Sequence, residues 1–174
     1  MVGNLGHPAP WVGRVGAVPI FLFATAIACA AVGGIFFAFS GFVMTALRRL
    51  SPADGIRAMQ AINVAAVRPP LMLAMLGTAA LVVAGALWAL LAGSASALVA
   101  AVGAIAYLAL VIALTGGFHV PRNIALGSLD PTAPEAAERW ERHASTWTRA
   151  NHLRALGGIL AGGAFALAGA MALG

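Results

Sequence analysis

Six residues between positions 136 and 154 have the types and the spacing to form a chemical site. They follow one another at steps of three and four, so a helix would place them on one face: Ala136, Trp140, His143, Trp147, Asn151 and Arg154. His152 falls about 100° away, on a neighbouring face. The stripe offers a flat apolar surface beside polar groups, and the function of those groups depends on what surrounds them.

The C-terminal end of this stripe runs directly into a segment that is apolar after Arg154. Polar side chains at such a boundary need partners or a water-filled cavity, and are functional candidates for that reason. We therefore take Asn151, His152 and Arg154 as the candidate catalytic residues. A purely anchoring function stays open, because tryptophans gather at membrane interfaces and arginines at helix ends extend to lipid headgroups.

Other polar residues lie in two segments, 48–70 and 117–152, which would face the same side of the membrane. In the first, Ser51 can cap a helix that starts at Pro52, and this helix carries polar side chains on adjoining faces. These side chains either line a pocket or bond neighbouring helices. The predicted substrate-binding residues are Gln60, Asn63, Asn123, Trp140, His143 and Trp147.

No metal site is predicted from the spacing of metal-ligating residues. His119, His143 and His152 would lie on one side of the membrane, but they form no known ligand motif and no carboxylate accompanies them. The single cysteine, Cys29, lies within an apolar run and has the pattern of a small buried hydrophobe. Phosphate loops, dinucleotide fingerprints and serine triads are not found.

Composition decides the class of protein that positions these residues. The 174 residues are 61% hydrophobic and 9% charged, whereas ordinary globular domains are about 25% charged. The chain is therefore predicted to be an integral membrane protein with the lipid bilayer as its surroundings. Its net charge of +5 comes from arginines that flank apolar segments, which indicates topology signals and no nucleic-acid partner.

The expected fold is an all-α membrane four-helix bundle with amphipathic helical extensions on the cytoplasmic side. A loose polar tail (1–16) would precede one four-span domain (17–174), and Gly and Pro signals predict a break over 116–134. Gly158 and Gly162 suit close helix contact. The predicted spans are about 17–47, 71–92, 95–116 and 153–173.

Charge asymmetry predicts the orientation. Nine of the ten arginines and all five acidic residues lie in or beside the loops 48–70 and 117–152. The positive-inside rule makes those loops cytoplasmic and both termini non-cytoplasmic, in a plasma or inner membrane.

Three motifs in close succession resemble the anthrone oxygenase-like family of small four-helix membrane proteins. The resemblance covers nearly the whole chain beyond the tail, although His119, His143 and Ala150 depart from the residues common in relatives. The matching positions are Pro52, Gly55, Ile56, Met59, Gln60, Ile62 and Asn63; Val120, Pro121 and Asn123; and Trp147, Thr148, Asn151, His152 and Arg154.

The resemblance implies a cofactor-independent oxygenase that converts a polycyclic phenolic or anthrone-like substrate to a quinone with O2. His152 would accept the proton, with Arg154, Asn151 or Asn123 stabilising the enolate. Trp140 and Trp147 would hold the flat rings. Two alternatives remain: a non-catalytic protein that binds or passes a small hydrophobic molecule, and a structural membrane subunit. Bound haem or metal and the oligomeric state are left open.

Overall fold

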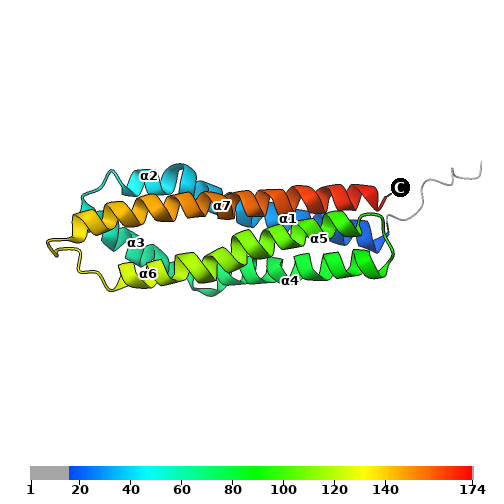
Figure 1. Ribbon diagram of the computed structural model, residues 1–174, viewed down its shortest axis with the longest axis horizontal. Helices are drawn as coiled ribbons and strands as arrows, with labels where there is room; N and C mark the ends of the chain where they lie inside the picture. The colour runs from blue at the N-terminus through cyan, green and yellow to red at the C-terminus, as the bar shows by residue number, and fades with distance from the viewer. Residues whose placement is uncertain (1–15, 174) are drawn as a thin grey trace, which may run out of the picture.

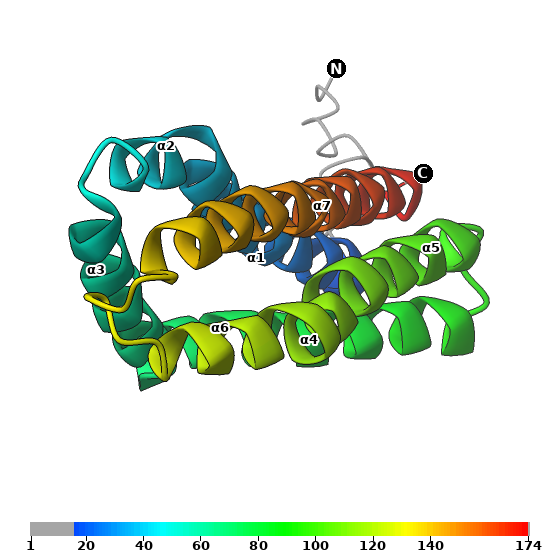
Figure 2. The ribbon, with the colours of Figure 1, turned by 60° about the vertical axis from the view of Figure 1, so that its left-hand side comes forward.

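A computed structural model describes residues 16–173, which are 86% helix and contain no strand. Its four long apolar helical stretches run side by side along one axis (Figure 1), and the helix over Pro52–Ala66 crosses them near one end (Figure 2). The elements are α1 (Ala17–Ala38), η1 (Phe39–Val43), α2 (Met44–Leu47), α3 (Pro52–Ala66), α4 (Pro69–Leu91), α5 (Ala97–Tyr107), η2 (Leu108–Ala113), η3 (Thr115–His119), α6 (Val120–Gly127) and α7 (Ala136–Met171). The three elements named η are π-helical turns inside longer helices.

The four stretches are long and apolar enough to cross a membrane: Ala17–Leu47, Pro69–Leu91, Ala97–Gly127 and Ala136–Met171. Their outward faces carry large apolar side chains, such as Ile27 (72% exposed) and Leu91 (85% exposed). Such a surface would be unfavourable in water but matches the hydrocarbon of a bilayer. The predicted all-α membrane bundle is therefore confirmed.

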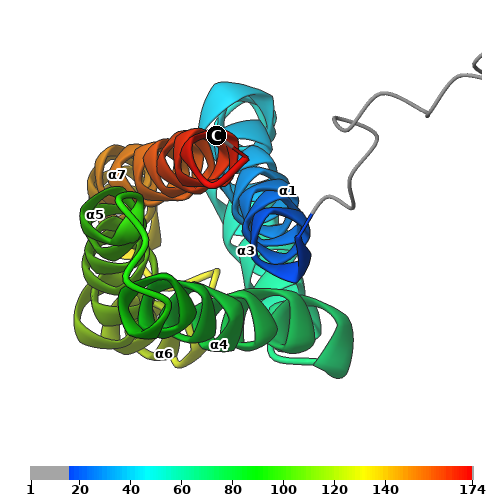
Figure 3. The same cartoon turned by 90° about the vertical axis from the view of Figure 1, so that its right-hand side faces the viewer.

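The bundle is closed by contacts between neighbouring helices in the order α1, α4, α5, α7 (Figure 3). Helix α7 packs most closely against α1, where Gly158 and Gly33 meet. A Cβ atom on Gly158 would lie 2.6 Å from the Gly33 Cα, and one on Gly162 would lie 3.2 Å from the Ala26 carbonyl oxygen. Small residues thus bring these two backbones together, as the spacing of Gly158 and Gly162 predicted.

Helix length separates the membrane part from an arginine-rich end. The 23 residues of α4 extend for about 35 Å, which matches the hydrocarbon core, whereas the 36 residues of α7 extend for about 54 Å. The excess projects beyond the start of α4 together with α2, α3 and α6 (Figure 2). We call this projecting part, which includes residues 136–150 of α7, the arginine-rich end.

Helix α3 starts where the sequence predicted. The Ser51 hydroxyl accepts a 3.2 Å hydrogen bond from the Asp54 backbone N–H and donates a 2.6 Å bond to the Asp54 carboxylate. That bond also holds the pKa of the Asp54 carboxyl below its ordinary value. The Pro69–Pro70 pair begins α4, so α3 ends before it at Ala66.

The predicted break over 116–134 is wrong for its first part. The third stretch stays helical through Pro121 to Gly127, and only residues 128–135 connect it to α7. The Val120 N–H bonds to the Thr115 carbonyl five residues earlier. A π-helical turn is wider than an α-turn, and a proline at the start of α6 has no backbone N–H that must find an acceptor. For these two reasons Pro121 does not end the helix.

The predicted loose tail over 1–16 lies outside the described residues, apart from Gly16. The fourth long helix begins at Ala136 and continues without interruption into the membrane part. The stripe of side chains from Ala136 to Arg154 therefore runs along one continuous helix, from the arginine-rich end into the bundle.

Candidate active site

A small cavity lies where the membrane part of the bundle meets the arginine-rich end. It has a volume of about 60 Å³ and receives side chains from α1, η1, α3, α4, α6 and α7. Its aromatic wall is Phe36, Phe39 and Trp147, and its polar side chains are Asn63, Asn123 and Arg154. Four predicted site residues therefore meet in this junction cavity, although they lie far apart in the sequence.

Arg154 is a buried cation in this cavity. Its residue is 7% exposed, and its guanidinium carbon lies 3.7 Å from the centroid of the Phe36 ring and 5.8 Å from that of Trp147. Within residues 16–173 no carboxylate pairs with it. A buried charge without a counter-ion is costly, so an anion bound in the cavity would be strongly favoured.

Two buried N–H donors in the cavity have no acceptor. Neither Arg154 Nε nor Asn63 Nδ2 makes a hydrogen bond to any described residue. Buried donors are normally paired with a protein group or an ordered water, so two unpaired donors in one cavity call for an explanation such as a bound ligand, ion or water. The cavity thus offers two donors and one positive charge to an oxygen atom of a ligand.

The indole of Trp147 is held in place from two sides. Its Nε1 donates a 3.0 Å hydrogen bond to Asn123 Oδ1, and the Phe39 ring lies tilted against it at 6.1 Å between centroids. The His119 ring meets Trp147 edge-on, at 5.2 Å and 87°. Trp147 therefore forms a wall with the cavity on one side and His119 on another.

His119 was absent from the predicted site residues. It is completely buried, and its Nδ1 lies 3.2 Å from the Leu114 carbonyl oxygen. Because a carbonyl only accepts, this contact favours the tautomer with the proton on Nδ1, which leaves a basic lone pair on Nε2, an atom without a hydrogen-bond partner. A histidine at the end of an apolar span was the signal that could have identified it.

Asn151 lies next to the cavity but has a structural contact. Its Nδ2 donates to the Phe36 carbonyl at 2.7 Å and to the Ser40 hydroxyl at 2.6 Å. The residue is fully buried. It therefore ties α7 to the junction of α1 and η1, which fixes the position of Phe36.

His152 is separated from the other predicted catalytic residues. Its side chain is exposed on the outward face of α7, beside the exposed Leu153. It lines neither the junction cavity nor the groove described below. The structure thus brings Arg154 into the cavity, places Asn151 behind it, and leaves His152 outside.

Gln60 and Trp140 hold the arginine-rich end together. Gln60 Nε2 donates to the carbonyls of Leu126 and Leu129 at 2.9 and 3.0 Å, which anchors the end of α6 to α3. Trp140 is 3% exposed and presses on Gly55, where a Cβ atom would lie 2.8 Å from the indole. Both side chains make contacts between helices, and neither lines the junction cavity or the groove between α6 and α7.

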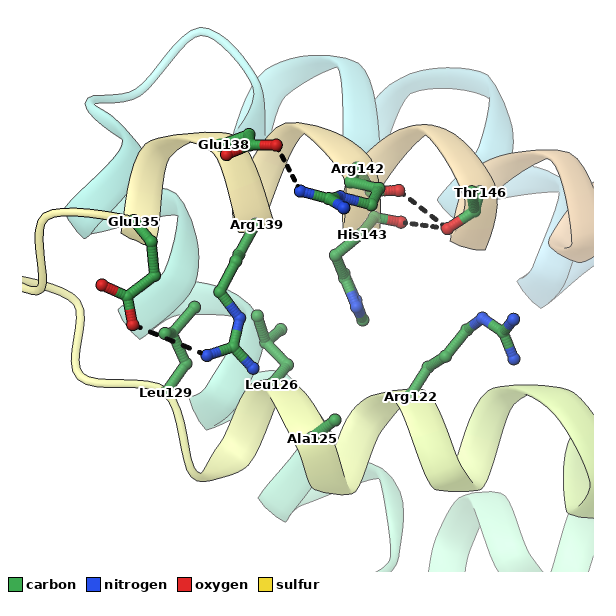
Figure 4. Close-up of a pocket in the computed structure, with 10 residues that line it drawn as sticks. All are labelled: Arg122, Ala125, Leu126, Leu129, Glu135, Glu138, Arg139, Arg142, His143 and Thr146. Carbon is green, nitrogen blue, oxygen red and sulfur yellow. Dashed lines mark hydrogen bonds and ion pairs between the residues drawn. The ribbon is translucent and has the colours of Figure 1, made fainter.

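His143 faces a larger groove between α6 and α7, with a volume of about 520 Å³ (Figure 4). Its ring stacks on Trp140 at 6.2 Å and 16°. The groove is also lined by Arg122, Arg139 and Arg142. We call it the α6–α7 groove.

Within residues 16–173 no group of three or more His, Cys, Asp or Glu side chains is arranged to hold a metal ion. The buried donors of the junction cavity are N–H groups, which bind oxygen atoms and anions and do not ligate metals.

Fold and site together define an integral membrane four-helix protein with an aromatic, cationic cavity at one end of the bundle. A family model described as anthrone oxygenase matches residues 69–167, which is more than half of the chain. The chain belongs to the anthrone oxygenase family, as its motifs indicated. The match includes Asn123, Trp147 and Arg154 and begins after α3. No curated protein and no solved structure matches the chain.

Proposed function

We propose that this protein is a membrane-embedded oxygenase that oxidises an anthrone-like polycyclic phenol to a quinone in the junction cavity. The observation that carries the proposal is the pair of unpartnered donors, Arg154 Nε and Asn63 Nδ2, beside an uncompensated guanidinium. An enolate or phenolate oxygen is an anion that accepts hydrogen bonds, and its flat rings suit the walls formed by Phe36 and Trp147.

The reaction balances without a further reactant. An anthrone loses a proton from the ring carbon opposite its ketone, and the resulting enolate is stabilised by Arg154. O2 then adds to that carbon and gives a hydroperoxide after protonation. Loss of the second hydrogen as a proton, with cleavage of the O–O bond, gives the second carbonyl and water. One anthrone and one O2 thus become one anthraquinone and one water.

The proton acceptor in this proposal is His119, in place of His152. A tricyclic substrate is larger than the 60 Å³ cavity, so we propose that it displaces Trp147 and breaks the hydrogen bond from Trp147 Nε1 to Asn123 Oδ1. That movement would uncover His119 Nε2, which holds a lone pair and has no hydrogen-bond partner. The exposed position of His152 gives it no comparable access.

We further propose that O2 reacts directly with the enolate and that no bound redox group is needed. A carbanion conjugated to two aromatic rings is electron-rich enough to reduce O2. Access would be through the membrane interface, where a lipophilic phenol concentrates. The charge distribution supports a cytoplasmic position for the arginine-rich end.

The test is O2-dependent quinone formation by the protein purified in mild detergent, with an absorption spectrum taken first. We expect turnover of an anthrone and about a 100-fold lower kcat/KM for Arg154→Gln, because one oxyanion donor contributes about that factor. Arg149→Gln is the matched control, since Arg149 is exposed on the same helix. Full activity of Arg154→Gln would contradict the proposal, and a haem or flavin band would contradict its cofactor-independent part.

The alternative is a non-catalytic protein that binds a small hydrophobic anion. It is favoured by one observation: no histidine or carboxylate lines the cavity among the described residues. Arg154-dependent binding of an anthrone without any quinone formation would support this alternative.

A further inference from the structure

We propose that the α6–α7 groove is a second binding site, for an anionic amphiphile with one acidic group beside an apolar body. The groove, about 520 Å³ in volume, is far larger than the junction cavity and opens at the arginine-rich end. Figure 4 shows Arg139 and His143 pointing from α7 into the space that Arg122 enters from α6. Nothing in the proposed oxygenase chemistry uses this groove.

Arg122 supplies the positive charge for the acidic group. The other two groove arginines pair with glutamates, Arg139 with Glu135 at 3.8 Å and Arg142 with Glu138. Arg122 pairs with no carboxylate in the described part of the chain.

The Arg122 guanidinium lies 3.4 Å above the Phe118 ring and uses one N–H on the Phe118 carbonyl, at 3.2 Å. A planar guanidinium that is stacked on a ring keeps its remaining N–H groups in fixed directions, which suits a carboxylate or a phosphate.

His143 supplies a second polar contact. Its Nε2 is buried in the groove and has no partner among the described residues. Stacking on Trp140 fixes the plane of the ring. A fixed, unpartnered imidazole nitrogen can donate to the same acidic group that Arg122 attracts.

The apolar body of the ligand would lie along the wall made by α6. Ala125, Leu126 and Leu129 line the groove between its polar residues. A site with a few polar groups over an apolar wall is typical of pockets that bind amphipathic small molecules. Two sources offer this chemistry: an aromatic acid and the headgroup region of an anionic phospholipid, since the groove lies beyond the start of α4, near the membrane surface.

The experiment measures binding to the full chain in phosphatidylcholine nanodiscs, without a reaction. Anthraquinone-2-carboxylate and the neutral 2-methylanthraquinone are titrated while tryptophan fluorescence is recorded, because Trp140 stacks on His143 at the groove. We expect the acid to bind at least 10-fold more tightly than the neutral compound. In an Arg154→Gln background, where the junction cavity carries no positive charge, Arg122→Gln should remove that preference, since a hydrogen bond to a charged group contributes about a factor of 10 or more.

Three further variants keep the result interpretable. Arg149→Gln, exposed on α7 and absent from the groove, should bind as the wild type does. His143→Phe, which keeps the stacking on Trp140, should weaken the acid several-fold. Arg154→Gln should retain the Arg122-dependent preference, so failure of the oxygenase proposal and failure of this one are distinguishable.

Repeating the titration with phosphatidylglycerol in the nanodiscs shows whether the natural ligand is a phospholipid headgroup or an aromatic acid. If phosphatidylglycerol weakens binding of anthraquinone-2-carboxylate to the wild type but not to Arg122→Gln, the groove binds the lipid headgroup. If phosphatidylglycerol does not weaken that binding, the groove binds the aromatic acid. Equal binding of the acidic and neutral compounds, or wild-type preference when Arg122→Gln is combined with Arg154→Gln, would overturn the proposal.

Discussion

The side-chain amide of Asn151 donates a 2.7 Å hydrogen bond to the backbone carbonyl of Phe36. One turn further along α7, the Arg154 guanidinium stacks on the ring of the same Phe36. Helix α7 thus contacts one residue of α1 through both its backbone and its ring. The register between these two helices therefore sets where the cationic wall of the junction cavity lies.

Asn151→Leu should destabilise the protein without removing a cavity-lining side chain. The substitution leaves the buried Ser40 hydroxyl without the donor that reaches it at 2.6 Å. A buried polar group left unpaired costs about 1–3 kcal/mol, so thermal unfolding in detergent should occur at a lower temperature. Ser40→Ala, which leaves the Phe36 bond in place, should cost less; an equal cost for both would contradict the assignment.

Gly158→Ala should separate α1 from α7. The added methyl group would lie 2.6 Å from the backbone of Gly33, which cannot move aside as a side chain could. We expect a loss of about 1–3 kcal/mol, measured by thermal denaturation. Gly163→Ala is the matched control, because its added methyl would meet no atom of another helix within 4 Å, and it should be neutral or slightly stabilising.

His119→Gln should reduce quinone formation more than His152→Ala does. A general base contributes about 10²–10⁴-fold, and Gln keeps a polar side chain of similar reach without the basic nitrogen. Steady-state kcat with an anthrone is the measurement, after a melting curve has shown that both variants fold. A larger loss in His152→Ala would return the proton acceptor to the exposed histidine.

Labelling of single cysteines should show the orientation in the membrane. Cys29 is the single cysteine of the sequence, so a Cys29→Ala background carries no thiol. In cells or oriented vesicles, Ser128→Cys beyond α6 should react only from the cytoplasmic side. Ala95→Cys, in the α4–α5 loop at the opposite end, should react only from outside. The reverse pattern would mean that the arginine-rich end is not cytoplasmic.

Much of the fold could be predicted because its signals are local. Uncharged apolar runs, the Ser51 cap and the Pro69–Pro70 pair each act within a few residues. The continuation of the third stretch to Gly127 could not be predicted, since a π-helical turn before Pro121 has no periodicity that distinguishes it from a loop.

Only part of the candidate site could be predicted from the sequence. Asn63, Asn123, Trp147 and Arg154 do line one cavity. Gln60 and Trp140 were expected to bind substrate, yet they pack α3 against α6 and α7. His119 was not selected, because a single histidine at the end of a span does not reveal its neighbours.

By itself, the sequence determined that the protein is a four-helix membrane protein with its polar residues at one end, and that it resembles the anthrone oxygenase family. Only the tertiary structure decided which polar side chains share a cavity. Helical spacing shows which residues lie on one face of α7, but it does not show which face turns inward. That choice depends on where α1 and α3 pack, through the glycine contact at Gly158 and the Trp140 contact at Gly55. The same packing buries Arg154 and leaves His152, two residues away, on the outside.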